Sequence, residues 1–301
     1  MTKLIVGFGE ALVDVLPSGE VVGGAPLNFS LRAAGLCRPL GWSAALVTRI
    51  GSDARGEQIL QELARSQLDT SAVQVDLARP TGYVDVTLQA GQPSYVIGQN
   101  VAWDHIAFQP PVPSMAQRAA AVCFGTLAQR CPQTTATLDH FLNTAEQAVK
   151  IVDINLRQPY PDAEVIRHSL TLANVLKCNE EELRLLAKWL DLTQREQPQR
   201  IASELQETFQ LDSVFWTRGA SGCVLQRGAE QVDGAVPQLP RAENADSVGA
   251  GDAASAALAV GLVAQWPAER IVRTANYCGA FAASCRGATA PFPQDFLQQL
   301  L

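Results

Sequence analysis

No Gly-Lys-Ser or Gly-Lys-Thr step and no Cys-x-x-Cys pair occurs in the 301 residues of this sequence. The first absence excludes a Walker-type nucleotide site, and the second argues against a zinc site. Seven cysteines are scattered along the chain, an odd number that favours reduced thiols over a disulfide framework. The three histidines show no metal-ligand spacing, so we expect them to be structural or exposed to solvent.

Basic runs and long apolar runs are also missing. The net charge of −7 would repel a polyanion such as nucleic acid, although a local site could still bind magnesium-screened ATP. The longest apolar stretch, residues 253–265, is too short to span a bilayer. The first residues predict a strand and not a signal peptide, because Glu10 interrupts them early. We therefore expect a cytoplasmic protein with no nucleic-acid or membrane partner.

Apolar residues make up 47% of the chain and charged residues 18%, a composition typical of soluble globular proteins. Short apolar runs alternate with helical patterns, which predicts βα units around a mainly parallel sheet. The runs expected to form buried strands are residues 4–8, 44–49, 121–124, 151–153, 175–177 and 214–217.

Two segments, residues 11–23 and 81–97, instead alternate apolar and polar residues and contain turn signals. This pattern predicts antiparallel, half-exposed strands. Because both segments lie in the first third of the chain, they could form a small separate sheet. From periodicity alone, that sheet is either an edge hairpin or a lid over a site.

The most informative motif is Asp-Ser-Val-Gly-Ala-Gly-Asp at residues 246–252, followed at once by an alanine-rich helical pattern. The small residues suit a helix entrance, where the first N–H groups and the helix dipole attract an anion. Asp252 in the first turn could accept a proton from an attacking hydroxyl while the amides hold a phosphoryl group. A glycine-rich helix cap without a ligand is the plainer alternative.

A second motif, Gly-Gly-Ala-Pro-Leu-Asn at residues 23–28, combines two glycines with a proline suited to a first helical turn. Asn28 and the preceding Asp14 could converge on vicinal sugar hydroxyls, because the carboxylate accepts hydrogen bonds and the amide both donates and accepts. Ordinary turn chemistry would explain the same residues.

Polar side chains also follow two predicted strands, at residues 153–157 (Asp-Ile-Asn-Leu-Arg) and 179–182 (Asn-Glu-Glu-Glu). Ligands of α/β sheets bind at this end of the strands. Asn179 and Glu182 would suit water-mediated magnesium binding, and Arg157 could neutralise phosphate charge. Read alone, residues 179–182 are better explained as the acidic start of a helix.

Taken together, these motifs resemble those of the ribokinase-like, or phosphofructokinase-B, carbohydrate kinases. Residues 23–28 match the N-terminal Gly-Gly…Asn signature, residues 51–56 approximate Gly-Asp-Asp-x-x-Gly, and residues 179–182 match Asn-x-x-Glu. Residues 246–252 match the C-terminal Asp-Thr-x-Gly-Ala-Gly-Asp signature, with serine in place of threonine. The four motifs keep the family's order and spacing along nearly the whole chain.

The resemblance implies a three-layer α/β/α fold over a single domain, residues 1–301, with a small antiparallel β lid from about 11–23 and 81–97. It implies an ATP-dependent kinase that uses Mg²⁺ and transfers the γ-phosphoryl group in line to a sugar hydroxyl. The catalytic residues would be the base Asp252 and the anion-hole residues Gly249, Ala250 and Gly251. The sugar would bind Asp14, Gly24, Asn28, Tyr95 and Arg157. The nucleotide would bind Asn179, Thr217, Gly219, Gly222 and Asn276, with Glu182 and Asn179 organising magnesium through water.

The resemblance also raises the question of a monovalent cation, K⁺ in many members, beside the anion hole. Asp246 and carbonyls near Gly287 and Ala288 would bind it, but Pro291 replaces a serine that some members use. Members often dimerise through the lid, so a homodimer is an expectation from the resemblance alone.

Residues 23–26 and 153–157 look most like the fructokinase branch, so fructose is the expected acceptor. Other ketoses, 2-keto-3-deoxygluconate and nucleosides are the alternatives within the family. A catalytically silent sugar-sensing protein is a further alternative, against which Asp252 argues. A dinucleotide oxidoreductase is disfavoured because Leu12 occupies the place of the third fingerprint glycine.

Overall fold

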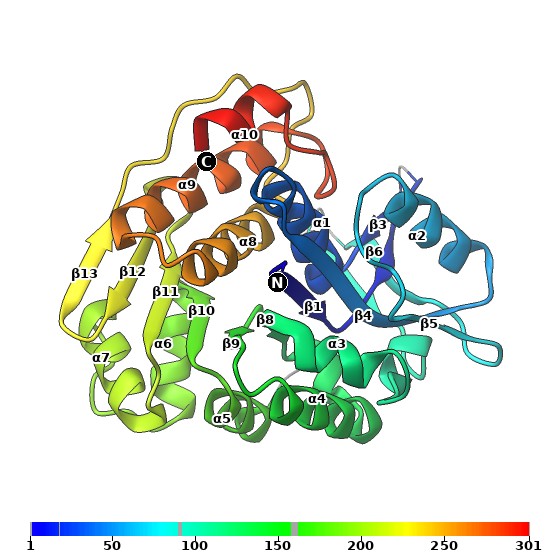
Figure 1. The fold of residues 1–301 in the computed structure, drawn as a ribbon, viewed down its shortest axis with the longest axis horizontal. Helices are drawn as coiled ribbons and strands as arrows, with labels where there is room; N and C mark the ends of the chain where they lie inside the picture. The colour runs from blue at the N-terminus through cyan, green and yellow to red at the C-terminus, as the bar shows by residue number, and fades with distance from the viewer. Residues whose placement is uncertain (1, 18, 90–91, 158–161, 301) are drawn as a thin grey trace.

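A computed structural model describes residues 2–17, 19–89, 92–157 and 162–300 of the chain. The side chains of residues 86–89, 92–95 and 299–300 lie outside this description. The described residues form two β-sheets, a large one flanked by helices and a small one at one side of the molecule (Figure 1).

The large sheet has the order β13-β12-β11-β10-β9-β8-β1-β4-β5. Its strands pair in parallel from β5 to β11, and β12 and β13 add an antiparallel edge. All five residues of β1 are buried, as expected for a parallel strand covered on both faces. The strands are β1 (Leu4–Phe8), β4 (Ser43–Gly51), β5 (Val73–Asp76), β8 (Ala119–Gly125), β9 (Val149–Asp153), β10 (Val175–Asn179), β11 (Ser213–Thr217), β12 (Cys223–Arg227) and β13 (Glu230–Asp233).

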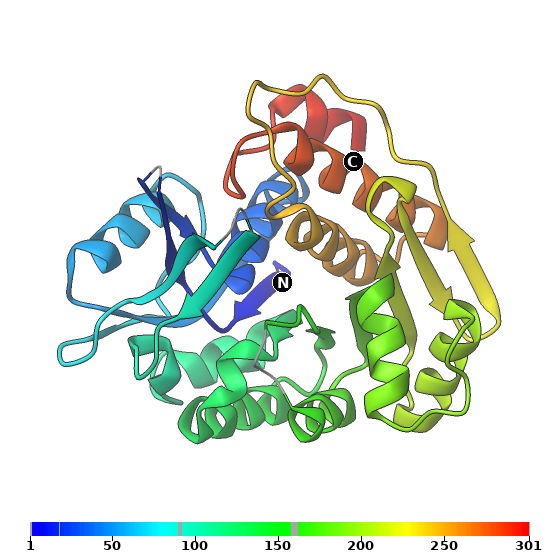
Figure 2. The ribbon, with the colours of Figure 1, turned by 180° about the vertical axis from the view of Figure 1, so that it is seen from behind.

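Helices cover both faces of the large sheet and give it three layers (Figures 1 and 2). One layer consists of α1 (Ala25–Cys37), α8 (Ala250–Val263), α9 (Ala268–Ser284) and α10 (Gln294–Leu300). The opposite layer consists of α3 (Val112–Arg118), α4 (Pro132–Thr144), α5 (Ala163–Leu172), α6 (Glu180–Trp189) and α7 (Pro198–Phe209). The predicted three-layer α/β/α class is confirmed.

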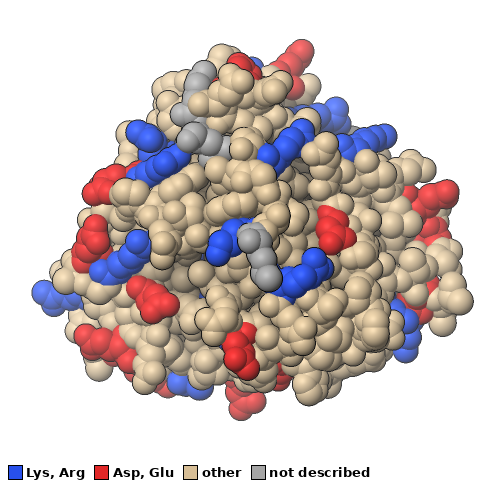
Figure 3. All heavy atoms as spheres, in the orientation of Figure 1, with Lys and Arg blue, Asp and Glu red and all other residues tan. Residues whose placement is uncertain are grey.

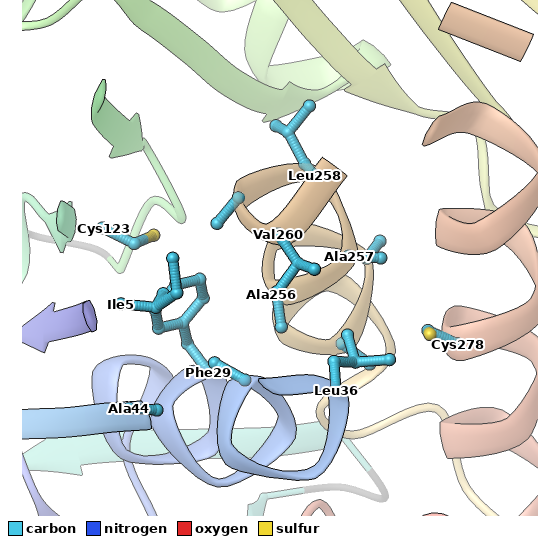
Figure 4. Packing of buried hydrophobic residues seen from close by; sticks show 14 of the residues in the cluster. Ile5, Phe29, Leu36, Ala44, Cys123, Ala256, Ala257, Leu258, Val260 and Cys278 are labelled. Carbon is cyan, nitrogen blue, oxygen red and sulfur yellow. The ribbon is translucent and has the colours of Figure 1, made fainter. Parts of the chain in front are cut away.

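The packing of α8 against α1 brings two distant parts of the chain together (Figure 4). Alanines such as Ala256 and Ala257 give α8 a small-residue surface, which lets Phe29 and Leu36 of α1 pack closely onto it. The buried faces run back to the first turns of both helices. The N-terminal and C-terminal motifs therefore lie next to each other.

The small sheet is built from the two predicted segments and has the order β3-β2-β6-β7. The outer pairs, β2–β3 and β6–β7, are antiparallel, whereas the central β2–β6 pair is parallel. Helix α2 packs beside it and contacts β2 and β3. These elements are β2 (Leu12–Leu16), β3 (Gly19–Gly23), β6 (Gly82–Gln89), β7 (Gln92–Ile97) and α2 (Ala54–Ala64).

Charges of both signs are scattered over the face shown in Figure 3. This face therefore offers no continuous basic track of the kind that binds nucleic acid. Among the described helices, none is long and apolar enough to cross a membrane.

Candidate active site

The first turn of α8 carries the C-terminal motif. Gly249 caps the helix in a left-handed conformation (φ 76°), and Ala250, Gly251 and Asp252 follow it. A Cβ at Gly249 would lie 2.6 Å from the Cβ of Ala288, so this turn requires glycine. The first turn of a helix directs N–H groups and the positive end of the dipole outward, which suits a phosphate group.

The carboxyl group of Asp252 is almost fully buried, with 9% of the residue exposed. Burial and the nearby Asp153 carboxylate together raise its pKa to about 6, although the charges of Lys177 and Arg157 and the hydrogen bond from Asn28 oppose the rise. A carboxylate with a pKa close to working pH is well matched to accepting a proton from a hydroxyl. This pKa is compatible with the role of base, which stays a prediction for Asp252.

Asn28 lies one turn into α1 and contacts the predicted base directly. Its Nδ2 donates a 2.9 Å hydrogen bond to Oδ2 of Asp252. Its Oδ1 is buried and has no hydrogen-bond partner among the described residues, so it can accept one from a hydroxyl group. Gly24 caps α1 with φ 108°, where a Cβ would lie 2.6 Å from the carbonyl oxygen of Glu10. The glycine is thus required for the approach that places Asn28.

Asp14 belongs to β2 of the small sheet and is half-buried. Burial raises its pKa, and the charge of Arg157 opposes the rise. The charge of Arg157 also lowers the pKa of Glu10 and of Asp252, so this positive charge lies among three acidic side chains. Arg157 therefore lies close enough to both Asp14 and Asp252 to affect their pKa values, and the sugar-binding roles of Asp14 and Arg157 stay predictions. The side chain of Tyr95, the remaining predicted sugar ligand, lies outside the described residues.

Sequence reasoning missed the role of Lys177. Its Nζ donates a 2.9 Å hydrogen bond to Oδ1 of Asp153, whose Oδ2 accepts one of 2.9 Å from Ser255 on α8. Burial alone would lower the pKa of Lys177, but the carboxylates of Asp153 and Asp252 raise it above the usual value. A Cβ at Gly251 would lie 3.2 Å from Lys177 Nζ, so the ammonium group lies beside the first turn of α8. The signal was a lysine inside an otherwise apolar strand.

Glu10, which follows β1, was also missed. It is buried, and its Oε2 has no hydrogen-bond partner among the described residues. Burial raises its pKa to about 7, and the Asp252 carboxylate contributes to the rise. Glu10, Asp153 and Asn155 line a small pocket of about 10 Å³, close to the room that one water molecule needs.

Asn179 and Glu182 form a capping box at the start of α6. Asn179 Oδ1 accepts the N–H of Glu182 at 2.8 Å, and Glu182 Oε2 accepts the N–H of Asn179 at 2.8 Å. Glu182 Oε1 also accepts the N–H of Leu156 at 2.8 Å. The pair therefore has a structural role, and it joins the ends of β9 and β10. Each carboxylate oxygen keeps a second lone pair that could accept a metal-bound water.

The predicted nucleotide residues lie at the end of β11, in the turn before β12 and in the middle of α9. Thr217 pairs with Asn179 in the β10–β11 register, next to the capping box. Asn276 Nδ2 donates a 2.8 Å hydrogen bond to the carbonyl of Gly234, and a Cβ at Gly222 (φ 83°) would meet that carbonyl at 2.4 Å. Gly219 also has a positive φ and open space around it. The structure brings these residues into one region, and their role in binding nucleotide stays a prediction.

Asp246 connects the C-terminal motif to the loop after α9. Its Oδ1 accepts the N–H of Val248 at 2.9 Å, and its Oδ2 accepts the N–H of Gly287 at 3.1 Å. Among the described residues, no group of three or more His, Cys, Asp or Glu could hold a metal ion.

The family model for pfkB family carbohydrate kinases matches residues 12–295. The chain belongs to this family. Among curated proteins, a fructokinase of Klebsiella pneumoniae is 29% identical over 98% of this chain and 98% of its own length. The pfkB family assignment confirms the resemblance that the four motifs carry.

Solved structures of similar proteins agree in fold. A sugar kinase of Pyrococcus horikoshii in complex with ATP has a TM-score of 0.80 at 24% identity, covering 99% of this chain and 100% of its own. A fructokinase double mutant of Vibrio cholerae bound to fructose, ADP and potassium has a TM-score of 0.80 at 22% identity, covering 100% and 98%. At these identities the likeness establishes the fold alone.

Proposed function

We propose that this pfkB-family chain is an ATP-dependent fructokinase in which Asp252 is the base. The observation that carries the proposal is the hydrogen bond between Asn28 and Asp252. It joins the sugar-binding motif to the predicted base at the first turn of α8. The K. pneumoniae fructokinase, aligned over nearly all of both chains, supports fructose as the acceptor.

In the proposed reaction, a sugar hydroxyl lies between Asn28 and Asp252 and gives its proton to the Asp252 carboxylate. Its oxygen forms a bond to the γ-phosphorus of ATP, and the bond from that phosphorus to the β-phosphate oxygen breaks, leaving ADP. The N–H groups at the start of α8 stabilise the charge that develops on the transferred group. Lys177, next to Gly251, adds a fixed positive charge at the same place.

The phosphates would extend from α8 toward the ends of β10 and β11, where Asn179 and Thr217 are register partners. Glu182 and Asn179 would hold Mg²⁺ through water molecules, since their oxygens keep free lone pairs. When bound, Mg²⁺ neutralises phosphate charge. The small sheet, which carries Asp14, would serve as the lid over the sugar.

The test is ADP release with Mg·ATP and a panel of fructose, tagatose, ribose, 2-keto-3-deoxygluconate and adenosine. We expect turnover with fructose and a loss of at least about a thousandfold in kcat for Asp252→Asn, since the amide cannot take the proton. The exposed Asp191→Asn is the matched control and keeps activity. Turnover only with another acceptor would move the substrate assignment, and intact ATP and sugar binding without ADP release would indicate a silent sensor.

A further inference from the structure

Arg32 is a buried charged residue that the proposed reaction does not use. It lies on α1, one helical turn beyond Asn28, and only 2% of it is exposed. Its Nη2 donates a 2.7 Å hydrogen bond to the carbonyl oxygen of Ala288, and its Nη1 donates to that of Ala290. In the described part of the chain, its acceptors are thus backbone carbonyls and not carboxylates.

Two aromatic rings complete the surroundings of this guanidinium group. Its Cζ lies 4.9 Å from the ring centroid of Phe292 and 5.8 Å from that of Phe281. Carbonyl oxygens and ring faces are groups that stabilise a cation without neutralising it. Among the described residues its hydrogen bonds go to carbonyls, and burial lowers its pKa although the Asp252 carboxylate opposes this. Such a buried charge is costly to fold, which argues for a role beyond packing.

The carbonyls that Arg32 holds belong to the loop behind the anion-binding turn. Ala288 packs against Gly249 so closely that any Cβ at Gly249 would collide with it. Gly287 donates its N–H to Asp246, and the N–H of Asp246 donates to the carbonyl of Cys285 at 3.1 Å. The loop segment 285–290 and the turn 246–250 therefore brace each other, and Arg32 fixes the loop from the side of α1.

The family resemblance assigns a monovalent cation to Asp246 and to carbonyls near Gly287 and Ala288, and here the Ala288 carbonyl already accepts a hydrogen bond from Arg32. Both oxygens of Asp246 already accept backbone N–H groups, so each has only one lone pair left for a cation. The carbonyls of Ala288 and Ala290 point at a guanidinium group, so a second cation that shared them would be repelled by Arg32. The loop at residues 285–290 therefore already has a positive charge beside it, that of Arg32.

We propose that Arg32 is a positioning residue that supplies, from within the chain, the charge that a bound monovalent cation would supply to the loop behind the phosphoryl-binding turn. This inference rests on the proposed kinase function. Its consequence is that catalysis needs neither K⁺ nor Na⁺, and that K⁺ does not stabilise the fold more than other salts do.

The first experiment needs no variant. Thermal unfolding and fructose phosphorylation are measured in KCl, NaCl and choline chloride at equal ionic strength. We expect kcat to agree within twofold in the three salts and the unfolding midpoint to show no shift specific to K⁺. Activation by K⁺ of fivefold or more, or a midpoint raised by K⁺ alone, would overturn the proposal.

The second experiment uses Arg32→Ala, with the exposed Arg38→Ala at the end of the same helix as the control. We expect Arg32→Ala to lose at least tenfold in kcat with less than a threefold change in the KM for fructose. Millimolar guanidinium or K⁺ should restore part of the loss, which a purely structural defect would not allow. A stable variant with wild-type kcat in choline chloride refutes the assignment.

If Arg32→Ala does not fold, the salt comparison on the wild type still decides. The thermal measurement requires no turnover, so it gives its answer for any acceptor sugar. A lack of ADP release by the wild type would count against the proposed function, whereas a K⁺-specific rise in the unfolding midpoint would count against the role of Arg32.

Discussion

Asn28 and Asp252 are 224 positions apart in the sequence, and Nδ2 of the first lies 2.9 Å from Oδ2 of the second. The contact exists because α1 and α8 pack along an alanine-rich face up to their first turns. One amide group therefore restrains the Asp252 carboxylate and keeps its own Oδ1 free to accept a hydrogen bond, as the proposed reaction requires. Several measurements can test what this relationship implies.

Removing the amide should change the pH dependence of the reaction. Asp252 must be ionised to act, so activity should fall as the pH drops through its pKa of about 6. The hydrogen bond from Asn28 stabilises the ionised form, so Asn28→Ala should move the acid limb of kcat/KM to higher pH and lower its maximum by about 10- to 100-fold. The pH–rate profile measures both effects. The exposed Asn143→Ala is the control, and an acid limb left at the wild-type pH contradicts the assigned role.

How far the sequence predicts this site depends on whether each residue works through a local motif or through long-range packing. Gly24 and Gly249 could be predicted because the start of a helix that packs closely against another segment requires glycine, and these glycines have a fixed spacing in their motifs. The strand ends that carry Asp153, Asn179 and Thr217 could be found because buried parallel strands give short apolar runs.

The roles of Lys177, Glu10 and Arg32 could not be predicted in the same way. Each is a single charged residue inside an apolar pattern, and its partner comes from another element. The neighbouring residues in the sequence do not show whether such a charge has a partner of opposite charge, or which residue that partner is. The strand order of the small sheet could not be predicted from the sequence for a similar reason. Its parallel β2–β6 pair joins segments about 70 residues apart.

Lys177 should be essential for both stability and turnover. Without its ammonium group, the buried Asp153 carboxylate would lose its ion-pair partner and Asp252 would lose a nearby positive charge. We expect Lys177→Met to lower the free energy of unfolding by about 3–5 kcal/mol at pH 8 and to reduce kcat by at least tenfold. Urea unfolding and ADP release measure these quantities. The exposed Lys188→Met should leave both quantities unchanged. A loss of the same size in that control would show that the effect is not specific to Lys177.

Glu10 should make the protein less stable as the pH rises. Its pKa is about 7 in the folded protein against an ordinary value of 4.5, so the folded state holds the proton more tightly. The stabilisation is complete below pH 4.5 and is lost as the pH rises to about 7. Glu10→Gln cannot ionise, so it should be more stable than the wild type at pH 8, by on the order of 3 kcal/mol or less.

This comparison is made by urea unfolding at pH 5 and pH 8, with the exposed Glu207→Gln as the control. The difference between Glu10→Gln and wild type should be larger at pH 8 than at pH 5. An equal difference at both pH values would show that Glu10 keeps the same protonation state in the folded and unfolded chain.

Two glycines with similar backbone conformations separate steric crowding from backbone strain. Gly249 has φ 76° and Gly228 has φ 53°, so alanine at either position carries a left-handed conformation that costs about 1–2 kcal/mol. Only at Gly249 does the new Cβ collide, because Ala288 lies 2.6 Å away whereas nothing lies within 4 Å at Gly228. Gly249→Ala must therefore shift the turn that presents the phosphoryl-binding amides. We expect it to lower kcat by at least 100-fold, against less than twofold for Gly228→Ala, with a smaller difference between the two in unfolding free energy. Parallel measurements of ADP release and urea unfolding decide the matter: if both variants lose activity in proportion to stability, the turn has no special part in catalysis.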